Sequence, residues 1–445
     1  MTEGRGYCHA ENGNDSNVTV TPSLRHTLLK GGNRPVQASV DRIRRDIDRI
    51  NQYTGPGLGI NRLSFTPEHQ GAVDYVRKQL EAIDYEMRVT AHGNYRFRRK
   101  GDDWSQPAVT SGSHLDAVPE GGRFDGVAGV VAAVEVARLL AESGDKPSVP
   151  YEIIVFSEEE GSRFGGVLTG SKAMIGSLTK KDLVQMQDQT GISYIEAIEN
   201  IGVNTSDWDK AVIHPGDINA YFELHIEQSL VLETKGIPVG IVTDITGIRI
   251  YRITYQGVPN HAGATPMPLR EDSLAAAAEA IQAIESLAQG ASGGTMVGTV
   301  GIIENEPNVS NVIPGRTHFS LDLRDIDREC LVNMSETIIS QVKDIATRRG
   351  IDCTIKMTAD APPVSLSNRA RQALLDATKE LGIKALEMPS GAGHDAQEMA
   401  RVTDVGMIFV PSIGGRSHCP EEESRFTDIA HGTSVLYSAI RKLCL

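Results

Sequence analysis

Strand-like and helix-like segments alternate in the first half of the sequence, and this alternation restricts the fold more than any other feature. Residues 108–111 form a short apolar run, residues 127–140 a long apolar helical pattern, and residues 151–157 a run rich in β-favouring side chains. Such alternation is typical of a parallel or mixed sheet that is covered by helices. We therefore predict an α/β fold, with catalytic groups beyond the carboxyl ends of the strands.

The pattern changes between residues 247 and 361, where strand, helix, strand, strand, helix and strand follow one another. The segments are 248–255, 273–288, 295–303, 317–323, 327–348 and 352–357. This βαββαβ order predicts a smaller α+β domain, in which a four-stranded sheet is backed by two helices. Helical patterns at 370–381 and 427–443 then return the chain to the first domain.

A chain of 445 residues is long enough for two domains, and the pattern implies that one interrupts the other. Helices are also expected near 37–52 and after Thr66, which would cap a helix that has Pro67 in its first turn. The preceding residues are rich in Asn, Ser, Thr and Gly, and we expect them to form a mobile tail. The predicted parts are the tail, the first catalytic part, the inserted domain and the second catalytic part, at 1–35, 36–246, 247–361 and 362–445.

Composition excludes several classes of partner. A net charge of −14 and a pI near 5.4 do not suit nucleic-acid binding, which depends on clustered Lys and Arg. The sequence has no run of about eighteen apolar residues, and its N-terminus lacks the apolar segment of a secretory signal. We therefore expect a cytoplasmic protein without membrane contacts. The five cysteines are scattered and form no CxxC pair, so we expect reduced thiols.

Two polar clusters directly follow predicted strands. SGSHLDAVPEGGRFDGVAGV contains His114, Asp116 and Asp125, and imidazole with carboxylate suits divalent transition metals. Taken alone, an HxD pair is more often a turn histidine capped by an aspartate. VFSEEEGSRFGG places Glu159 and Glu160 in a run of three glutamates, which repel one another unless cations neutralise them. A surface acidic run is the alternative, but the preceding buried-type strand favours a metal site.

Two further histidines lie in polar surroundings. YFELHIEQ places His225 between Glu223 and Glu227, on a strand with one unusually polar face. A lone strand histidine is more often a hydrogen-bonding group, whereas one flanked by carboxylates also suits a ligand with supporting contacts. GGRSHCPEEES places His418 in a Gly-rich loop, where the alternative is a simple turn.

The chain resembles the M20-type metallo-amidase family, through motifs that occur in the expected order from about residue 40 to the C-terminus. These motifs are SHLDAVPEGGRFDG, EEEGSRFG, ELHIEQ, NHAGATPM, NVSNVIPGR, LDLRD, SGAGHDA and SHCPEE. The branch that it resembles includes N-carbamoyl-L-amino acid hydrolases, allantoate amidohydrolases, ureidoglycolate amidohydrolases and yeast-type β-ureidopropionases. Related exopeptidases usually have a carboxylate at the position of His225, so they resemble this chain less.

The resemblance implies a cage for two divalent metal ions per subunit, with zinc, manganese, cobalt and nickel as candidates. His114 and His225 would hold one ion, and Glu160 and His418 the other. Asp125 would bridge both ions.

The resemblance also implies the catalytic groups. Glu159, beside the ligand Glu160, would be the general base, and Asp116 would orient His114. The inserted lid domain would pair with its copy in a second subunit. In this homodimer, His261 of NHAG would reach the partner's site and stabilise the oxyanion.

A third implication concerns substrate contacts. Arg324 in LDLRD would clamp a substrate carboxylate with its planar guanidinium. The other expected contacts are Gln228, Asn311, Gly391, Gly393 and His394. The alternative for Arg324 is a pair with Asp322 or Asp325, and the alternative for Asn311 is a turn.

The sequence departs from the family pattern near the expected substrate. Ser229 and Leu230 follow HIEQ where relatives commonly have Gly-Pro, and Arg416 replaces a typically apolar residue. Cys419 stands where Ser is usual, and its thiolate is an alternative metal ligand. These changes keep the expected cage intact but bear on the choice of substrate.

From this resemblance we expect a hydrolase that acts on non-peptide C–N bonds. Its expected reaction converts an N-carbamoyl-L-amino acid to the amino acid, CO2 and ammonia. Allantoate or ureidoglycolate amidohydrolase and β-ureidopropionase are alternatives with the same cage. An N-acyl amino acid deacylase or exopeptidase, and a non-catalytic dimeric binding protein, are further alternatives.

Overall fold

The computed structural model describes residues 37–291 and 293–445. The predicted tail at 1–35, including Cys8, lies outside the described residues. Among the described helices, none combines the length and apolar character needed to cross a membrane.

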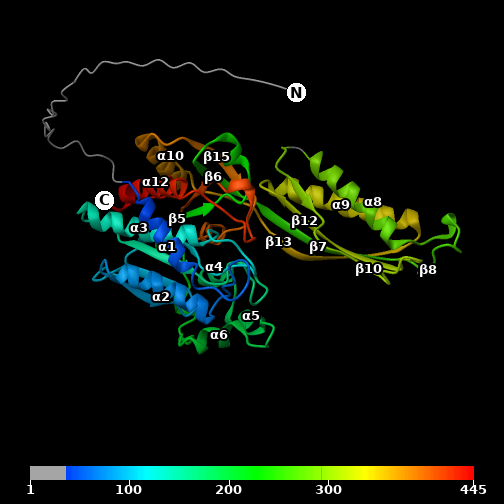
Figure 1. Cartoon of the computed structure of the whole chain (residues 1–445), viewed down its shortest axis with the longest axis horizontal. Coiled ribbons are helices and arrows are strands. Elements are labelled where there is room, and N and C mark those ends of the chain that lie inside the picture. Colours follow the sequence, from blue (N-terminus) through cyan, green and yellow to red (C-terminus); the bar gives the residue numbers. More distant parts are fainter. Residues whose placement is uncertain (1–36, 292) are drawn as a thin grey trace, which may run out of the picture. The chain divides into compact units, whose positions relative to one another are not determined.

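A nine-stranded mixed sheet forms the larger part of the fold (Figure 1). Its strand order is β1-β2-β4-β3-β5-β16-β6-β14, and β15 also pairs with β6. The central strands β4, β3, β5 and β16 are parallel to one another, whereas β2 and β6 run antiparallel to their inner neighbours. The strands are Tyr85–Val89 (β1), Tyr95–Arg99 (β2), Ala108–His114 (β3), Tyr151–Phe156 (β4), Ile218–Ile226 (β5), Val239–Ile245 (β6), Val364–Ser365 (β14), Ala385–Ser390 (β15) and Val405–Val410 (β16). The predicted mixed sheet is therefore confirmed.

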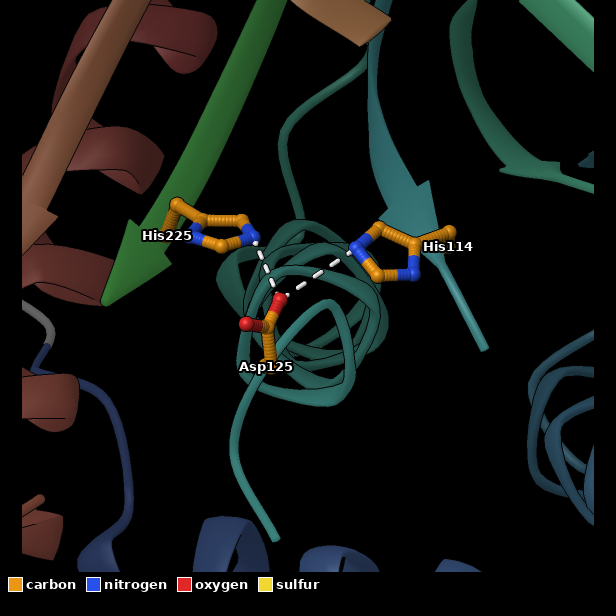
Figure 2. A group of neighbouring side chains, drawn as sticks. All are labelled: His114, Asp125 and His225. Carbon is orange, nitrogen blue, oxygen red and sulfur yellow. Dashed lines mark ion pairs between the residues drawn. The ribbon is translucent and has the colours of Figure 1, made fainter. Parts of the chain in front are cut away.

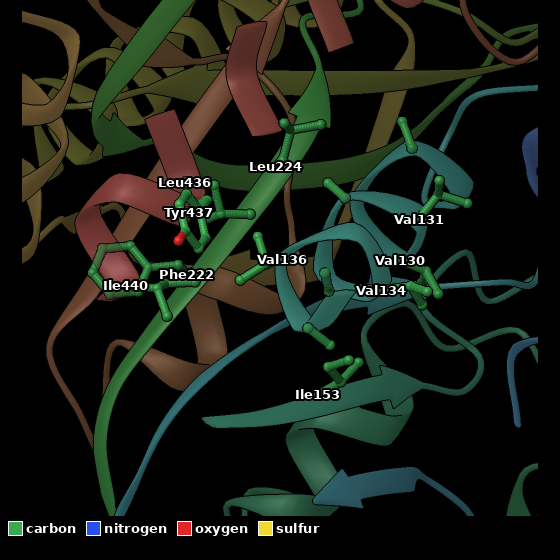
Figure 3. Packing of buried hydrophobic residues seen from close by; sticks show 14 of the residues in the cluster. Val130, Val131, Val134, Val136, Ile153, Phe222, Leu224, Leu436, Tyr437 and Ile440 are labelled. Carbon is green, nitrogen blue, oxygen red and sulfur yellow. The ribbon is translucent and has the colours of Figure 1, made fainter. Parts of the chain in front are cut away.

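Helices cover both faces of this sheet. Because successive strand residues point to opposite faces, Phe222 and Leu224 pack in one core and Tyr221 packs in the other. The first core also receives side chains from Val40–Ile50 (α1), Pro67–Glu81 (α2), Val127–Ser143 (α3), Asn368–Leu381 (α10) and Phe426–Cys444 (α12). The second receives side chains from Thr169–Met174 (α4) and Asp395–Met399 (α11). Figure 3 shows residues of the first core, including Val136 of α3, Phe222 of β5 and Leu436 of α12.

Local sequence signals explain where several helices begin. The Thr66 side chain accepts a hydrogen bond from the backbone N–H of His69, and Pro67 occupies the first turn of α2, as predicted. Two helices that the sequence pattern did not predict, Lys180–Gln185 (α5) and Tyr194–Asn200 (α6), each begin with a capping box. Their side chains pack in a small separate core that also contains Phe65, Phe164 and Trp208. A short helix, Val231–Lys235 (α7), follows β5.

A second sheet contains five strands and is covered on one face by two helices. The strands are Gly247–Gln256 (β7), Val297–Thr299 (β9), Ile303–Glu306 (β10), Arg316–Asp325 (β12) and Asp352–Ala361 (β13), and the helices are Ser273–Gln289 (α8) and Arg328–Arg349 (α9). The single strand predicted at 295–303 is wrong, because β9 and β10 are separate and both pair with β12. Gly301 lies in the break, where it has no side chain to pack on the sheet. Asn260–His261 (β8) and Val312–Ile313 (β11) form a further two-stranded sheet.

Candidate functional site

The predicted site residues lie at or just beyond the carboxyl ends of the four parallel strands. His114 is the last residue of β3, and Glu159 and Glu160 lie in the turn after β4. His225 is the penultimate residue of β5, and His418 lies in the loop after β16. Parallel strands end at the same edge of a sheet, so these residues converge although they are far apart in the sequence.

Asp125 lies at the centre of this group, just before α3. Its Oδ1 is 3.1 Å from Nε2 of His225 and 3.4 Å from Nε2 of His114. Figure 2 shows both imidazole rings pointing toward this carboxylate from β5 and β3. Its Oδ2 is 3.3 Å from Nε2 of His418. One carboxylate therefore contacts two histidines with one oxygen and a third with the other.

Two glutamates complete the group. Oε2 of Glu160 is 3.6 Å from Nε2 of His418, and Oε2 of Glu159 is 3.6 Å from Nε2 of His114. Most of these side chains are buried, but that of His418 is 49% exposed, so the group is open to a ligand on that side.

The site holds acidic and imidazole groups whose proton affinities are strongly perturbed. Burial, followed by the nearby Asp125 carboxylate, raises the pKa of Glu160 to about 7, and burial raises the pKa of Glu159 well above its ordinary value. Burial opposes protonation of His114, but the carboxylates of Glu159 and Asp125 raise its pKa well above its ordinary value. These carboxylates therefore favour a nearby positive charge, which protons or metal ions can supply.

The donor set fits divalent metal ions. Ligand atoms of His114, Asp125 and His225 lie within 4.8 Å of one another, as do those of Asp125, Glu160 and His418. The Nε2 atom of His114 is buried and has no hydrogen-bond partner among the described residues. An unpaired buried nitrogen that faces carboxylates is suited to metal coordination. Among the described groups of this kind, none includes Cys419.

Backbone contacts fix the orientation of the two strand histidines. Nδ1 of His114 lies 3.0 Å from the carbonyl oxygen of Asp116, and Nδ1 of His225 lies 3.0 Å from that of Ile226. Donation from Nδ1 leaves Nε2 to face Asp125. The Asp116 carboxylate instead accepts the backbone N–H groups of the Glu159–Glu160 turn, at 3.3 and 3.1 Å. Asp116 thus orients His114 through its carbonyl and the glutamate turn through its side chain.

Glu422 is a supporting residue that was not predicted from the sequence. Its buried carboxylate accepts the backbone N–H groups of Phe124 and Asp125 and the hydroxyl of Ser417. It therefore joins the loop that carries Asp125 to the loop that carries His418. The only sequence signal was its place in the SHCPEE motif.

A cavity of about 210 Å³ opens beside the Asp125 group. Four of the predicted substrate contacts line it, namely Gln228, Arg324, Gly393 and His394. Nε2 of Gln228 donates to Oδ2 of Asp125 at 2.8 Å, and His394 packs edge-to-face on the His225 ring. The predicted contact Gly391 does not line this cavity, but its carbonyl accepts a hydrogen bond from Nη1 of Arg324.

The Arg324 guanidinium already has an internal partner. Its Nε and Nη2 donate to the two oxygens of Asp322, at 2.9 and 3.0 Å, which is the alternative expected from the sequence. Each terminal nitrogen nevertheless keeps a second N–H, because a guanidinium carries five donors. Arg324 also lines the cavity, so its Asp322 pair and a substrate contact are compatible.

Two predicted residues lie apart from the cavity. His261 and Asn311 belong to the region of the two-stranded β8–β11 sheet, where both are exposed and the Asn311 carbonyl accepts the N–H of Ala262. Neither lines the cavity beside Asp125. Arg416 is exposed as well, with Nη1 3.9 Å from Glu421.

The chain is similar to known proteins over most of its length. The sequence profile of peptidase family M20/M25/M40 matches residues 111–442. The chain is 42% identical to an N-carbamoyl-L-amino acid amidohydrolase from Geobacillus stearothermophilus, over 87% of this chain and 94% of that protein. It is 37% identical to an N-carbamoyl-L-amino-acid amidohydrolase from Paenarthrobacter aurescens, over 92% of this chain and 98% of that protein. It is 36% identical to an allantoate amidohydrolase from Bacillus subtilis, over 86% of this chain and 93% of that protein. A crystal structure of a hydantoinase/carbamoylase family amidase from Burkholderia multivorans superposes with a TM-score of 0.86 at 31% identity, covering 92% of this chain and 98% of that one.

Proposed function

Because this chain belongs to peptidase family M20/M25/M40, we propose that it is a metal-dependent amidohydrolase that removes the carbamoyl group of an N-carbamoyl-L-amino acid. The reaction adds one water to the ureido group and releases the amino acid, CO2 and ammonia. The observation that carries the proposal is the position of Asp125 between His114 and His225 on one side and His418 on the other.

The cage would hold two ions. His114 and His225 would bind one, Glu160 and His418 the other, and Asp125 would contribute to both. When bound, divalent ions would supply Lewis acidity to the ureido carbonyl and lower the pKa of the attacking water.

Side chains of the protein would transfer the proton and bind the substrate. Glu159 lines the cavity and would accept a proton from the attacking water, then deliver it to the departing nitrogen. The remaining N–H groups of Arg324 would bind the substrate carboxylate, with Gln228, Gly393 and His394 around the ureido group.

A homodimer would complete the site. His261 and Asn311 do not line the cavity of their own chain, and Met267 and Leu269 beside them are 72% and 73% exposed. Exposed apolar side chains at the end of a domain are typical of an interaction surface. We therefore assign residues 247–361 the role of a lid and dimerisation domain that would carry His261 to the partner's site.

Hydrolysis of allantoate is the second candidate. It is favoured by the similarity to the Bacillus subtilis allantoate amidohydrolase over most of both chains, and allantoate also carries a carboxylate and a ureido group. The cage and Arg324 suit both substrates, so substrate preference must be measured.

The test is ammonia release by purified protein that has been loaded with manganese, cobalt or zinc. N-carbamoyl-L-amino acids, allantoate, ureidoglycolate and an N-acetyl-L-amino acid would be assayed in parallel. We expect ammonia from ureido compounds and no cleavage of the acetyl compound. Cleavage of the acetyl compound alone would identify a deacylase and overturn the proposal.

A further inference from the structure

The cavity extends beyond the Asp125 group to a wall formed by two short helices. Lys172 of α4 lines it, as do Gln397 and Glu398 of the neighbouring α11. We call these three residues the polar wall. None of them was expected from the sequence to contact a substrate.

Hydrogen bonds fix the polar wall relative to the reacting groups. The backbone N–H groups of Leu168 and Thr169, at the start of α4, donate to the carbonyl oxygens of Glu159 and Glu158 at 2.7 and 3.0 Å. The N–H of Ala396 in α11 donates to Oε2 of Glu223 in β5 at 3.0 Å. Both helices are thus attached to the strand ends that carry the site. Leu168 has a φ of 57°, a strained conformation for a leucine that is typical of functional sites.

Each residue of the polar wall has unused hydrogen-bonding capacity. Nζ of Lys172 donates to the carbonyl of Val167, and no described carboxylate pairs with this ammonium. Gln397 and Glu398 are only 5% and 8% exposed. Nε2 of Gln397 donates to Pro362 and Oε2 of Glu398 accepts from Arg401, but their Oε1 atoms have no hydrogen-bond partner among the described residues.

The free hydrogen-bonding groups of the polar wall favour some substrate side chains over others. An apolar side chain would cover Lys172 and Gln397 without offering either a hydrogen-bond partner, which carries an energetic cost. A second carboxylate would be attracted to Lys172 but repelled by Glu398. A cation would be attracted to Glu398 but repelled by Lys172. A neutral group with a carbonyl acceptor and N–H donors satisfies all three residues. The apolar Val167 and Ile248 also line the cavity and suit a short aliphatic stem.

We propose that the polar wall is the substrate side-chain subsite, and that it selects a neutral carboxamide or a second ureido group. The assignment rests on the proposed ureido hydrolysis and adds to it the chemical class of the substrate side chain. Lys172 would donate to the carbonyl of this group, and Oε1 of Gln397 and Glu398 would accept its N–H groups.

Three substrates of nearly the same shape test the assignment on the metal-loaded enzyme. N-carbamoyl-L-asparagine, N-carbamoyl-L-aspartate and N-carbamoyl-L-leucine differ mainly in whether the branched end is neutral and polar, anionic or apolar. We expect kcat/KM for the asparagine compound to exceed the other two by about tenfold or more. A preference for the leucine compound would overturn the assignment, and a preference for the aspartate compound would show an anion subsite instead.

Substitutions connect this preference to the polar wall. Lys172→Met should lower kcat/KM for the asparagine compound by about tenfold and change that for the leucine compound by less than about threefold. Glu398→Gln should raise kcat/KM for the aspartate compound relative to the asparagine compound by about tenfold, because it removes the repulsion. Lys181→Met, in exposed α5 and away from the cavity, is the matched control and should change neither ratio.

The outcomes separate this assignment from the proposed function. If Lys172→Met affects all three compounds equally, Lys172 supports the fold and the subsite assignment fails while ureido hydrolysis stands. If neither these compounds nor allantoate releases ammonia, the proposed function itself fails and the assignment fails with it.

Discussion

Glu158 and Glu159 are adjacent in sequence but differ in their surroundings. Oε1 of Glu158 accepts the backbone N–H groups of Arg163 and Phe164, so this side chain closes the turn after β4. The backbone of Glu158 has a φ of 56°. Burial, followed by the nearby Asp116, raises the pKa of Glu158 to about 7. Glu159 instead lines the cavity and faces His114. The two residues thus form a natural pair for testing which one is the base.

Glu159→Gln should lower kcat by about 10²- to 10⁴-fold, because the amide cannot accept the proton of the attacking water. Bound metal should stay unchanged, since Glu159 is not among the five proposed ligands. Glu158→Gln is the matched control and should keep most of the turnover, because its amide oxygen can still accept the two N–H groups. The reverse pattern of losses would move the base to Glu158.

His69 is a buried histidine, outside the proposed site, whose titration should be visible in folding stability. It is fully buried beside Phe65 and Tyr95, and its ring nitrogens have no hydrogen-bond partner among the described residues. Burial, followed by the positive charge of Arg62, lowers its pKa to about 3. Its folded pKa is below the ordinary value, so the unfolded chain binds the proton more readily and stability falls as pH drops from about 6.5 toward 3.

Replacing His69 by Leu should therefore flatten the pH dependence of unfolding. Relative to wild type, the variant should gain up to about 1.4 kcal/mol per pH unit as the pH is lowered below 6. Urea unfolding of both proteins at several pH values between 7 and 4 measures this difference. Parallel stability curves would show that His69 does not titrate as its burial implies.

At the scale of elements, α3 brings Asp125 to the strand ends. The helix begins after Gly126 and ends before Gly144, and both glycines have positive φ, 65° and 70°. A Cβ on Gly126 would lie 2.6 Å from the His114 ring, whereas one on Gly144 would meet no atom within 4 Å. Both ends of the helix thus carry a glycine with positive φ, although ψ is −47° at Gly126 and 6° at Gly144, and only Gly126 is packed against a proposed ligand.

Gly126→Ala should displace the His114 ring and lower both bound metal and turnover sharply. Gly144→Ala should cost only about 1 kcal/mol, the ordinary penalty of a side chain in the left-handed region, and leave bound metal unchanged. Elemental analysis and thermal unfolding of both variants measure these effects. Full metal content in Gly126→Ala would contradict the packing of His114 on α3.

The elements also show how far the sequence could predict the structure. The cap of α2 and the strands β3, β4 and β7 were predictable because their signals are local. The division into β9 and β10 depends on how each segment pairs with β12, and β16 was not predicted although its VGMIFV run is apolar. Glu422 was not found because it contacts Phe124, 298 residues away, and such contacts leave no local pattern. Lys172 was not found for the same reason, since only the fold brings α4 to the cavity.

At the scale of the whole molecule, the proposed dimer makes each site depend on two chains. A site would combine the cage and Glu159 of one chain with His261 of its partner. Glu159→Gln and His261→Ala chains should each be inactive alone. Mixing them under conditions that exchange subunits should restore about a quarter of wild-type turnover, because half of the dimers would contain one intact site.

Gel filtration of the wild-type protein is the control for this mixing experiment. A chain of 48.1 kDa should elute at about twice that mass. No recovery of turnover on mixing, with both variants dimeric, would place His261 outside the partner's site. Elution as a monomer with full turnover would exclude the composite site altogether.

Metal content and ammonia release, measured together during reconstitution, test the central claim most directly. Protein treated with a chelator and then titrated with manganese or cobalt would be assayed on an N-carbamoyl-L-amino acid at each step. We predict no turnover without metal and full turnover at about two ions per chain, the number that the Asp125 cage would hold. Undiminished ammonia release from protein that contains no metal would contradict the account.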